Sequence, residues 1–184
     1  MEGQDFKKNS ILADVNVPPM PAIASPGIIY NGKKAIGFDE IDQTIAYPDV
    51  RSFRRKFGAK RIGIISPFDK TGSEYAAQMF EDLGFTVVAS IGFSCANAVH
   101  IAHIPDFAKE QAILNYLATK ENRLDAIVQC GTNMSMSQIT EKLEPVLNIP
   151  ILGINAVTFW HALRQTGISD SFAGAGLVGS MHLD

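Results

Sequence analysis

Short apolar runs alternate with longer segments of helical spacing through most of the chain. Each apolar run is nearly continuous and of strand length, and Pro67 stops the first of them. A continuous apolar run of this kind predicts a strand that is buried on both faces. The runs that predict strands are residues 61–66, 85–91, 126–128 and 150–153.

The segments between these runs carry apolar side chains at the spacing of one helix face. Glycines follow three of them, at Gly58, Gly84 and Gly167, as is common at helix ends. The predicted helices are residues 48–57, 73–83, 106–117, 137–147 and 156–165. The apolar stripe is Tyr75, Met79, Phe80 and Leu83 in the second helix, and Phe107, Ile113, Leu114 and Leu117 in the third.

Buried strands that alternate with helices indicate a parallel sheet, because parallel strands need crossover connections that cover both faces. The predicted fold class is therefore α/β, a flavodoxin-like parallel sheet with helices on both faces, spanning residues 48–184. Residues 1–47 differ, because four prolines interrupt them and no helical stripe of more than two turns is present. We expect an irregular N-terminal arm or a truncated lobe there.

The composition argues against several classes of function. Of 184 residues, 46% are hydrophobic and 19% are charged, which is typical of a globular domain. The net charge of -3 gives no electrostatic reason to expect nucleic acid or an anionic membrane as a partner. No apolar run approaches the ~20 residues of a spanning helix, and residues 1–15 lack the apolar centre of a secretory signal. The two cysteines make no disulfide framework, so we expect a cytoplasmic protein.

Cys130 stands where the third predicted strand ends and a turn of Gly131, Thr132 and Asn133 leads toward a helix. Open α/β folds bind ligands at the carboxyl edge of the sheet, and a helix N-terminus favours negative charge. We therefore expect an exposed thiol whose pKa is below its ordinary value and which forms a thiolate more readily than Cys95. The alternative is an inert buried thiol, as free cysteines often are.

Three segments of the chain carry a resemblance to a known superfamily. They are residues 58–68, the Cys-Gly-Thr-Asn of residues 130–133 after a strand, and residues 155–164. In this order and at this spacing, they resemble the aspartate/glutamate/hydantoin racemase superfamily. The branch that they resemble is that of arylmalonate decarboxylase and maleate cis-trans isomerase.

The resemblance implies an enzyme of two similar lobes with the active site between them, which needs no metal, no pyridoxal phosphate and no nucleotide. Racemases and isomerases of this superfamily take one cysteine from each lobe, whereas the decarboxylase branch keeps only the second-lobe cysteine as a proton donor. Cys130 matches the second-lobe position, and residues 1–57 contain no cysteine. The first lobe is therefore expected to be incomplete. Because a lone lobe exposes the face that its partner covers, we expect a homo-oligomer or docking of the arm.

One suitably placed cysteine favours decarboxylation of a small arylmalonate-type carboxylic acid. Racemisation of an amino acid needs an acid and a base on opposite faces of the substrate, and isomerisation of maleate needs a nucleophile. Maleate isomerase and amino-acid racemase remain alternatives to the decarboxylase. A non-catalytic ligand-binding or vestigial protein is the alternative from another class.

The expected site combines a thiol with groups that hold a carboxylate. Loss of CO₂ leaves a carbanion, which backbone N–H groups and short hydroxyls stabilise. The expected catalytic residue is Cys130, and the expected substrate-binding residues are Gly131, Thr132, Asn133, Ser66 and Phe68. Phe68 stands where many relatives have a tyrosine. The structural alternative for Thr132, Asn133 and Ser135 is that they cap the following helix.

Four other side chains invite a functional interpretation that we do not favour. Cys95 follows the second predicted strand and reaches the same sheet edge, but the superfamily has no catalytic cysteine there. No carboxylate or cysteine completes a convincing set of metal ligands with His100 and His103, so we expect solvated or core histidines. His161 follows a tryptophan and is expected to pack and hydrogen-bond on the last helix.

Overall fold

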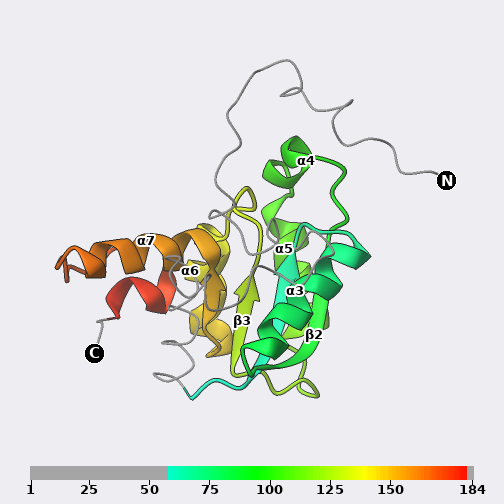
Figure 1. Cartoon of the computed structure of the whole chain (residues 1–184), viewed down its shortest axis with the longest axis horizontal. Coiled ribbons are helices and arrows are strands. Elements are labelled where there is room, and N and C mark those ends of the chain that lie inside the picture. Colours follow the sequence, from blue (N-terminus) through cyan, green and yellow to red (C-terminus); the bar gives the residue numbers. More distant parts are fainter. Residues whose placement is uncertain (1–57, 182–184) are drawn as a thin grey trace.

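The computed structural model describes residues 58–181, which form a four-stranded sheet (Figure 1). All three neighbouring pairs of strands are parallel. In spatial order the strands are β2 (Thr86–Gly92), β1 (Arg61–Ser66), β3 (Ala126–Gln129) and β4 (Ile151–Gly153). The predicted α/β fold class is confirmed.

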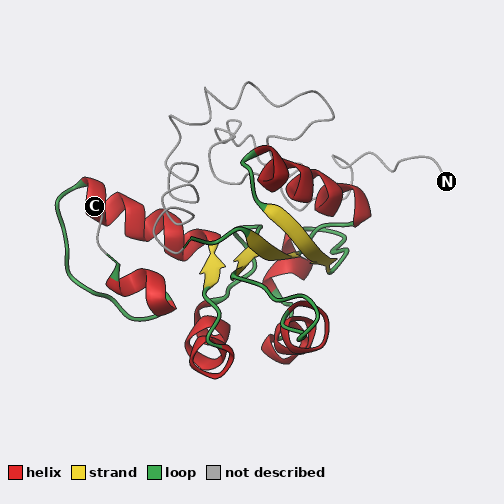
Figure 2. Cartoon of the chain, turned by 90° about the horizontal axis from the view of Figure 1, so that it is seen from below, coloured by secondary structure: helices red, strands yellow, loops and turns green. Residues whose placement is uncertain are grey.

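Helices cover both faces of the sheet (Figure 2). One face carries α3 (Lys70–Asp82) and α7 (Ile154–Gln165), and the other carries α5 (Asp106–Ala112), the π-helical turn η3 (Ile113–Leu117) and α6 (Ser137–Leu147). Two shorter elements, α4 (Ala98–Ala102) and the 3₁₀ helix η4 (Gly176–Ser180), have no counterpart among the predicted helices. Both are five-residue helices, too short for an apolar stripe to show in the sequence.

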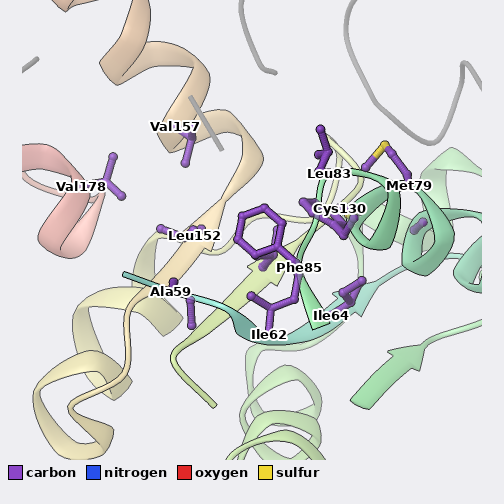
Figure 3. Packing of buried hydrophobic residues seen from close by; sticks show 14 of the residues in the cluster. Ala59, Ile62, Ile64, Met79, Leu83, Phe85, Cys130, Leu152, Val157 and Val178 are labelled. Carbon is purple, nitrogen blue, oxygen red and sulfur yellow. The ribbon is translucent and has the colours of Figure 1, made fainter. Parts of the chain in front are cut away.

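The strands divide the core into two clusters, because successive side chains of a strand point to opposite faces. Ile62 and Ile64 belong to the cluster on the side of α3 and α7, whereas Ile65 belongs to the cluster on the side of α5 and α6. All three are fully buried. Figure 3 shows the first cluster, in which Phe85 and Leu152 lie among the labelled side chains. Burial of each such side chain contributes about 1.5–3 kcal/mol to folding.

Local signals explain where two helices begin and end. The Asp69 carboxylate accepts a hydrogen bond from the Gly72 amide at 2.8 Å and caps α3, which therefore begins before the predicted 73–83. Asn148 adopts a left-handed conformation with φ 52° and ends α6 as predicted, after Leu147.

The helix predicted at 106–117 is wrong in two respects. It is an α-helix that turns into a π-helix at Ile113, and the change of period rotates the apolar stripe. Ile113 and Leu117 are buried, but Phe107 is 68% exposed and Leu114 is 38% exposed. The two side chains therefore lie outside the core that the stripe predicted.

The chain after α7 is attached to the body by buried polar side chains. Arg164 is 8% exposed, and its guanidinium donates to the carbonyls of Met181 at 2.7 Å and Ile168 at 2.8 Å. The Trp160 indole N–H donates to the same Met181 carbonyl at 2.8 Å. From the opposite face, Glu144 accepts the Leu177 amide at 2.8 Å.

The predicted arm 1–47 and the predicted helix 48–57 lie outside the described residues. Within residues 58–181, no helix has the length and apolar character required to cross a membrane.

Candidate active site at the carboxyl edge of the sheet

Three loops meet where β1, β2 and β3 end. The Cys130 amide donates to the Ile65 carbonyl at 3.0 Å, which joins the end of β3 to the end of β1. The Cys95 amide donates to the Pro67 carbonyl at 2.9 Å, which joins the loop after β2 to the loop after β1. Residues that are far apart in the sequence are therefore assembled at one edge, as expected for a parallel sheet.

Gly131 lies against the loop after β1. Its φ is 95°, and a Cβ atom there would be 2.6 Å from Cγ of Pro67 and 3.8 Å from Cε1 of Phe68. A side chain at this position is therefore opposed both by the backbone conformation and by the proline ring. The structure brings Gly131 and Phe68 together, as the predicted site requires.

The expectation of an exposed, acidic Cys130 is wrong. The side chain is 2% exposed and belongs to the apolar cluster on the α3 and α7 side, with Met79 and Leu83 (Figure 3). Burial raises the pKa of the Cys130 thiol from 9.0 to about 12. The helix that was expected to lower it begins only at Ser137, and helix dipole effects decay within one turn.

The other predicted residues are placed at different depths around Cys130. Ser66 is fully buried, and its hydroxyl lies 3.2 Å from that of Ser73 and accepts the Phe68 amide at 3.4 Å. Thr132 is half-buried and Asn133 is exposed. These hydroxyl and amide groups do not cap α6, because its N-cap residue is Met136 and no side chain caps it. The capping alternative is therefore wrong.

Three side chains that the sequence analysis did not single out bind the carbonyl groups of this loop. Gln129 is 2% exposed, and its Nε2 donates to the carbonyls of Cys130 at 2.8 Å and Gly131 at 2.6 Å. Asn155 Nδ2 donates to the Thr132 carbonyl at 2.8 Å. Lys109 is 3% exposed and its Nζ donates to the Ser135 carbonyl at 2.7 Å. No local motif marks the contacts of Asn155 and Lys109, because each reaches a backbone group far along the chain, whereas Gln129 binds the carbonyls of the next two residues.

The amide groups of the same loop are left available. Among residues 58–181, the amides of Gly131, Thr132 and Asn133 donate to no backbone or side-chain acceptor. Consecutive N–H groups without an acceptor, at a residue with positive φ, are donors of the kind that bind an anion. The loop therefore combines a protonated thiol with backbone donors for a carboxylate.

The remaining candidates lie apart from these donors. Cys95 is partly exposed, and burial raises its pKa as well. His100 and His103 are exposed on or beside α4. His161 is 8% exposed, and burial lowers its pKa. In the described part of the chain, no group of three or more His, Cys, Asp or Glu side chains is placed to hold a metal ion.

Two hollows in the surface do not coincide with Cys130. One, of about 780 Å³, lies at the amino edge of the sheet and is lined by Arg61, Lys120, Glu121, Arg123 and Asp125. Another, of about 340 Å³, is lined by residues at the end of β2 and the start of α3, including Ser73 and Ser90. Cys130, in contrast, is enclosed in the apolar cluster.

No family model and no curated protein matches the chain, but solved structures share its fold. Maleate isomerase Iso from Pseudomonas putida S16 is 19% identical, with a TM-score of 0.66 over 73% of this chain and 54% of that chain. Maleate cis-trans isomerase from Nocardia farcinica, in a cysteine mutant with a covalently bound succinylcysteine intermediate, is 18% identical, with a TM-score of 0.66 over 86% of this chain and 66% of that chain. Arylmalonate decarboxylase is 16% identical, with a TM-score of 0.61 over 71% of this chain and 57% of that chain.

The chain thus shares the fold of maleate isomerase and arylmalonate decarboxylase. It spans about half the length of the Pseudomonas isomerase.

Proposed function

We propose that this chain is the cysteine-bearing lobe of a cofactor-independent enzyme that acts on a small carboxylic acid, with Cys130 as the proton donor. The observation that carries the proposal is the combination of a thiol whose pKa is raised to about 12 with the amides of Gly131, Thr132 and Asn133, which have no acceptor among residues 58–181. The thiol has a proton to give at neutral pH, and the amides are donors for a carboxylate. The shared fold with the decarboxylase and the isomerases supports the assignment.

Decarboxylation of a malonate-type acid suits these groups best. The bond between the α carbon and one carboxylate breaks, CO₂ leaves, and the electron pair is delocalised onto the remaining carboxylate as an enediolate. Amide donors stabilise the developing charge, typically by ~3–4 kcal/mol for each donor. The Sγ–H bond of Cys130 then breaks as the new C–H bond forms, and water returns the proton to the sulfur.

The isomerase alternative rests on the succinylcysteine of the Nocardia enzyme. There the sulfur has added to the substrate, which requires a thiolate as the nucleophile. Burial raises the pKa of Cys130 to about 12, so the thiol holds its proton at neutral pH. The buried thiol therefore favours proton donation by Cys130, and an isomerase would need a second cysteine as its nucleophile.

Turnover in D₂O tests the proposal. The full-length protein is incubated with arylmalonates, maleate and single amino-acid enantiomers, and the products are analysed by NMR and mass spectrometry. We expect decarboxylation with one deuterium on the α carbon, and a loss of kcat of about 10²–10⁴-fold in Cys130→Ser. Cys95→Ser is the control and keeps the wild-type rate.

Each other outcome contradicts part of the proposal. Cys130→Ser turnover at the wild-type rate removes Cys130 from the mechanism. Conversion of maleate to fumarate without loss of CO₂ establishes the isomerase instead. No turnover and no rise in melting temperature with any acid of the panel favours the vestigial protein.

A further inference from the structure

Gln129 is the last residue of β3 and the residue before the proposed proton donor. Its side chain lines a small hollow on the α6 side of the sheet, opposite to the side on which Cys130 is buried. There Nε2 donates to the carbonyls of Cys130 and Gly131, and Oε1 accepts the Ile154 amide at 3.1 Å. Only one orientation of the side-chain amide satisfies two carbonyls and one N–H, so the network defines it.

These bonds determine the direction of two backbone donors. In a trans peptide unit, the C=O of one residue and the N–H of the next point in opposite directions. Because Gln129 binds the carbonyls of Cys130 and Gly131, the amides of Gly131 and Thr132 point away from the α6 side. These are two of the amides that have no acceptor among residues 58–181.

Asn155 extends the same arrangement by one peptide unit. Its Nδ2 donates to the Thr132 carbonyl at 2.8 Å, which turns the Asn133 amide away from Asn155. Asn155 follows Ile154, whose amide is bound by Gln129. The first turn of α7 and the end of β3 therefore hold the loop together.

We propose that Gln129 is a positioning residue, which binds the carbonyl side of the Cys130–Gly131–Thr132 backbone so that the amides of Gly131 and Thr132 face the carboxylate of the substrate. The inference rests on the proposed function and specifies how that site recognises its anion. Gln129 itself does not touch the substrate. Its contribution is to keep two N–H donors in one orientation before the charge develops.

Gln129→Glu and Gln129→Met test this inference. Glutamate keeps the size and the acceptor for Ile154 but lacks the two N–H donors, and its charge opposes the two carbonyls. Methionine removes the donors without adding a charge. An effect that both variants share therefore reports the loss of the donors, and any additional effect of glutamate reports the burial of its charge. Asn122→Asp is the matched control, because Asn122 Nδ2 also donates to two carbonyls, those of Tyr116 at 2.9 Å and Leu117 at 2.8 Å, away from the carboxyl edge.

We expect kcat/KM to fall about 100-fold in both Gln129 variants, as misplacement of reacting groups commonly costs. The fall should lie more in kcat than in KM, because the amides bind the enediolate more strongly than the starting carboxylate. Asn122→Asp should lose stability while both constants remain within about twofold of the wild type. Gln129 variants whose kcat and KM match those of Asn122→Asp would overturn the inference.

Amide hydrogen exchange separates this inference from the proposed function. In ¹⁵N-labelled protein without substrate, exchange of the Gly131 and Thr132 amides should change at least tenfold in Gln129→Met and stay unchanged in Asn122→Asp. Unchanged exchange in Gln129→Met shows that Gln129 does not orient these amides, and overturns the inference even if the wild type is an active decarboxylase. If the wild type acts on no acid of the panel, the proposed function fails by itself, and the exchange data still decide whether Gln129 orients the loop.

Discussion

The amino and carboxyl edges of the sheet treat their backbone polar groups differently. At the amino edge, the Asp125 carboxylate accepts the amides of Lys60 and Arg61, each at 2.8 Å, and the Arg61 guanidinium donates to the carbonyls of Asn122 and Arg123. Donors and acceptors are both satisfied there. At the carboxyl edge, the side-chain amides of Gln129 and Asn155 bind the carbonyls of the Cys130 loop, and the amides of Gly131, Thr132 and Asn133 have no acceptor among residues 58–181.

The difference supports the carboxyl edge as the proposed site of the ligand. Buried or half-buried amides without an acceptor are unfavourable in the free protein. A loop with several such amides side by side therefore gains the most favourable free energy when an anion binds them. A charged hollow at the amino edge is larger, but its backbone groups are already used by its own side chains. The proposed site therefore rests on backbone donors without an acceptor among residues 58–181, and not on the volume of a hollow.

Gly131→Ala should have the largest effect on this comparison. The new Cβ meets the Pro67 ring and the backbone must keep a positive φ, so we expect a loss of about 2–4 kcal/mol in the free energy of unfolding. Gly167→Ala is the control, since Gly167 has φ 82° with nothing within 4 Å of a Cβ and should lose only about 1–2 kcal/mol. Urea unfolding measures both. Equal losses would mean that contact with Pro67 does not shape the carboxyl edge.

The second-largest expected effect is that of pH on the free energy of unfolding, through the thiol of Cys130. Its pKa is about 12 in the folded protein and 9.0 ordinarily, so the folded state holds the proton more strongly. This contribution to stability is complete below pH 9 and is lost as the pH rises from 9 to 12, by up to about 1.4 kcal/mol per pH unit. The free energy of unfolding of the wild type and of Cys130→Ser is measured from pH 8 to 11, and the difference between the two proteins gives the contribution of the thiol. Parallel curves for the two proteins would show that the thiol is open to solvent.

Asp125→Asn at the amino edge should have the smallest effect. The carboxylate accepts two amides but is exposed, so we expect a loss of about 1 kcal/mol in the free energy of unfolding. Turnover should remain at the wild-type rate, because no donor of the carboxyl edge is disturbed. A drop in kcat of tenfold or more would contradict the functional separation of the two edges.

The fold was predictable because burial on both faces makes β1 and β3 continuous apolar runs, and few other structures suit such runs. The position of Cys130 at the end of a strand was predictable for the same reason. Its burial was also present in the pattern, since Val128 and Cys130 share a strand face. The expected effect of a helix N-terminus pointed the other way, and the predicted direction of the Cys130 pKa shift was therefore wrong.

The roles of Gln129, Asn155 and Lys109 were beyond the sequence for a physical reason. Every residue type has a backbone carbonyl, so a polar side chain that binds one does not require a particular residue type as its partner. No sequence motif results. Lys109 illustrates this, because it lies 26 positions from Ser135 and reaches its carbonyl only after α5 and the loop have packed together. A buried lysine or glutamine in an apolar segment is the signal that remains.

The bond between Gln129 and Ile154 also has a consequence for biosynthesis. The ribosome releases β1, β2 and the Cys130 loop before β4 and α7, so the loop emerges without the Ile154 and Asn155 groups that complete its contacts. The tail reached by Arg164 and Trp160 comes later still. A nascent chain arrested before residue 154 would therefore carry the cysteine without its finished surroundings, and the site would be completed only after the first turn of α7 has been synthesised.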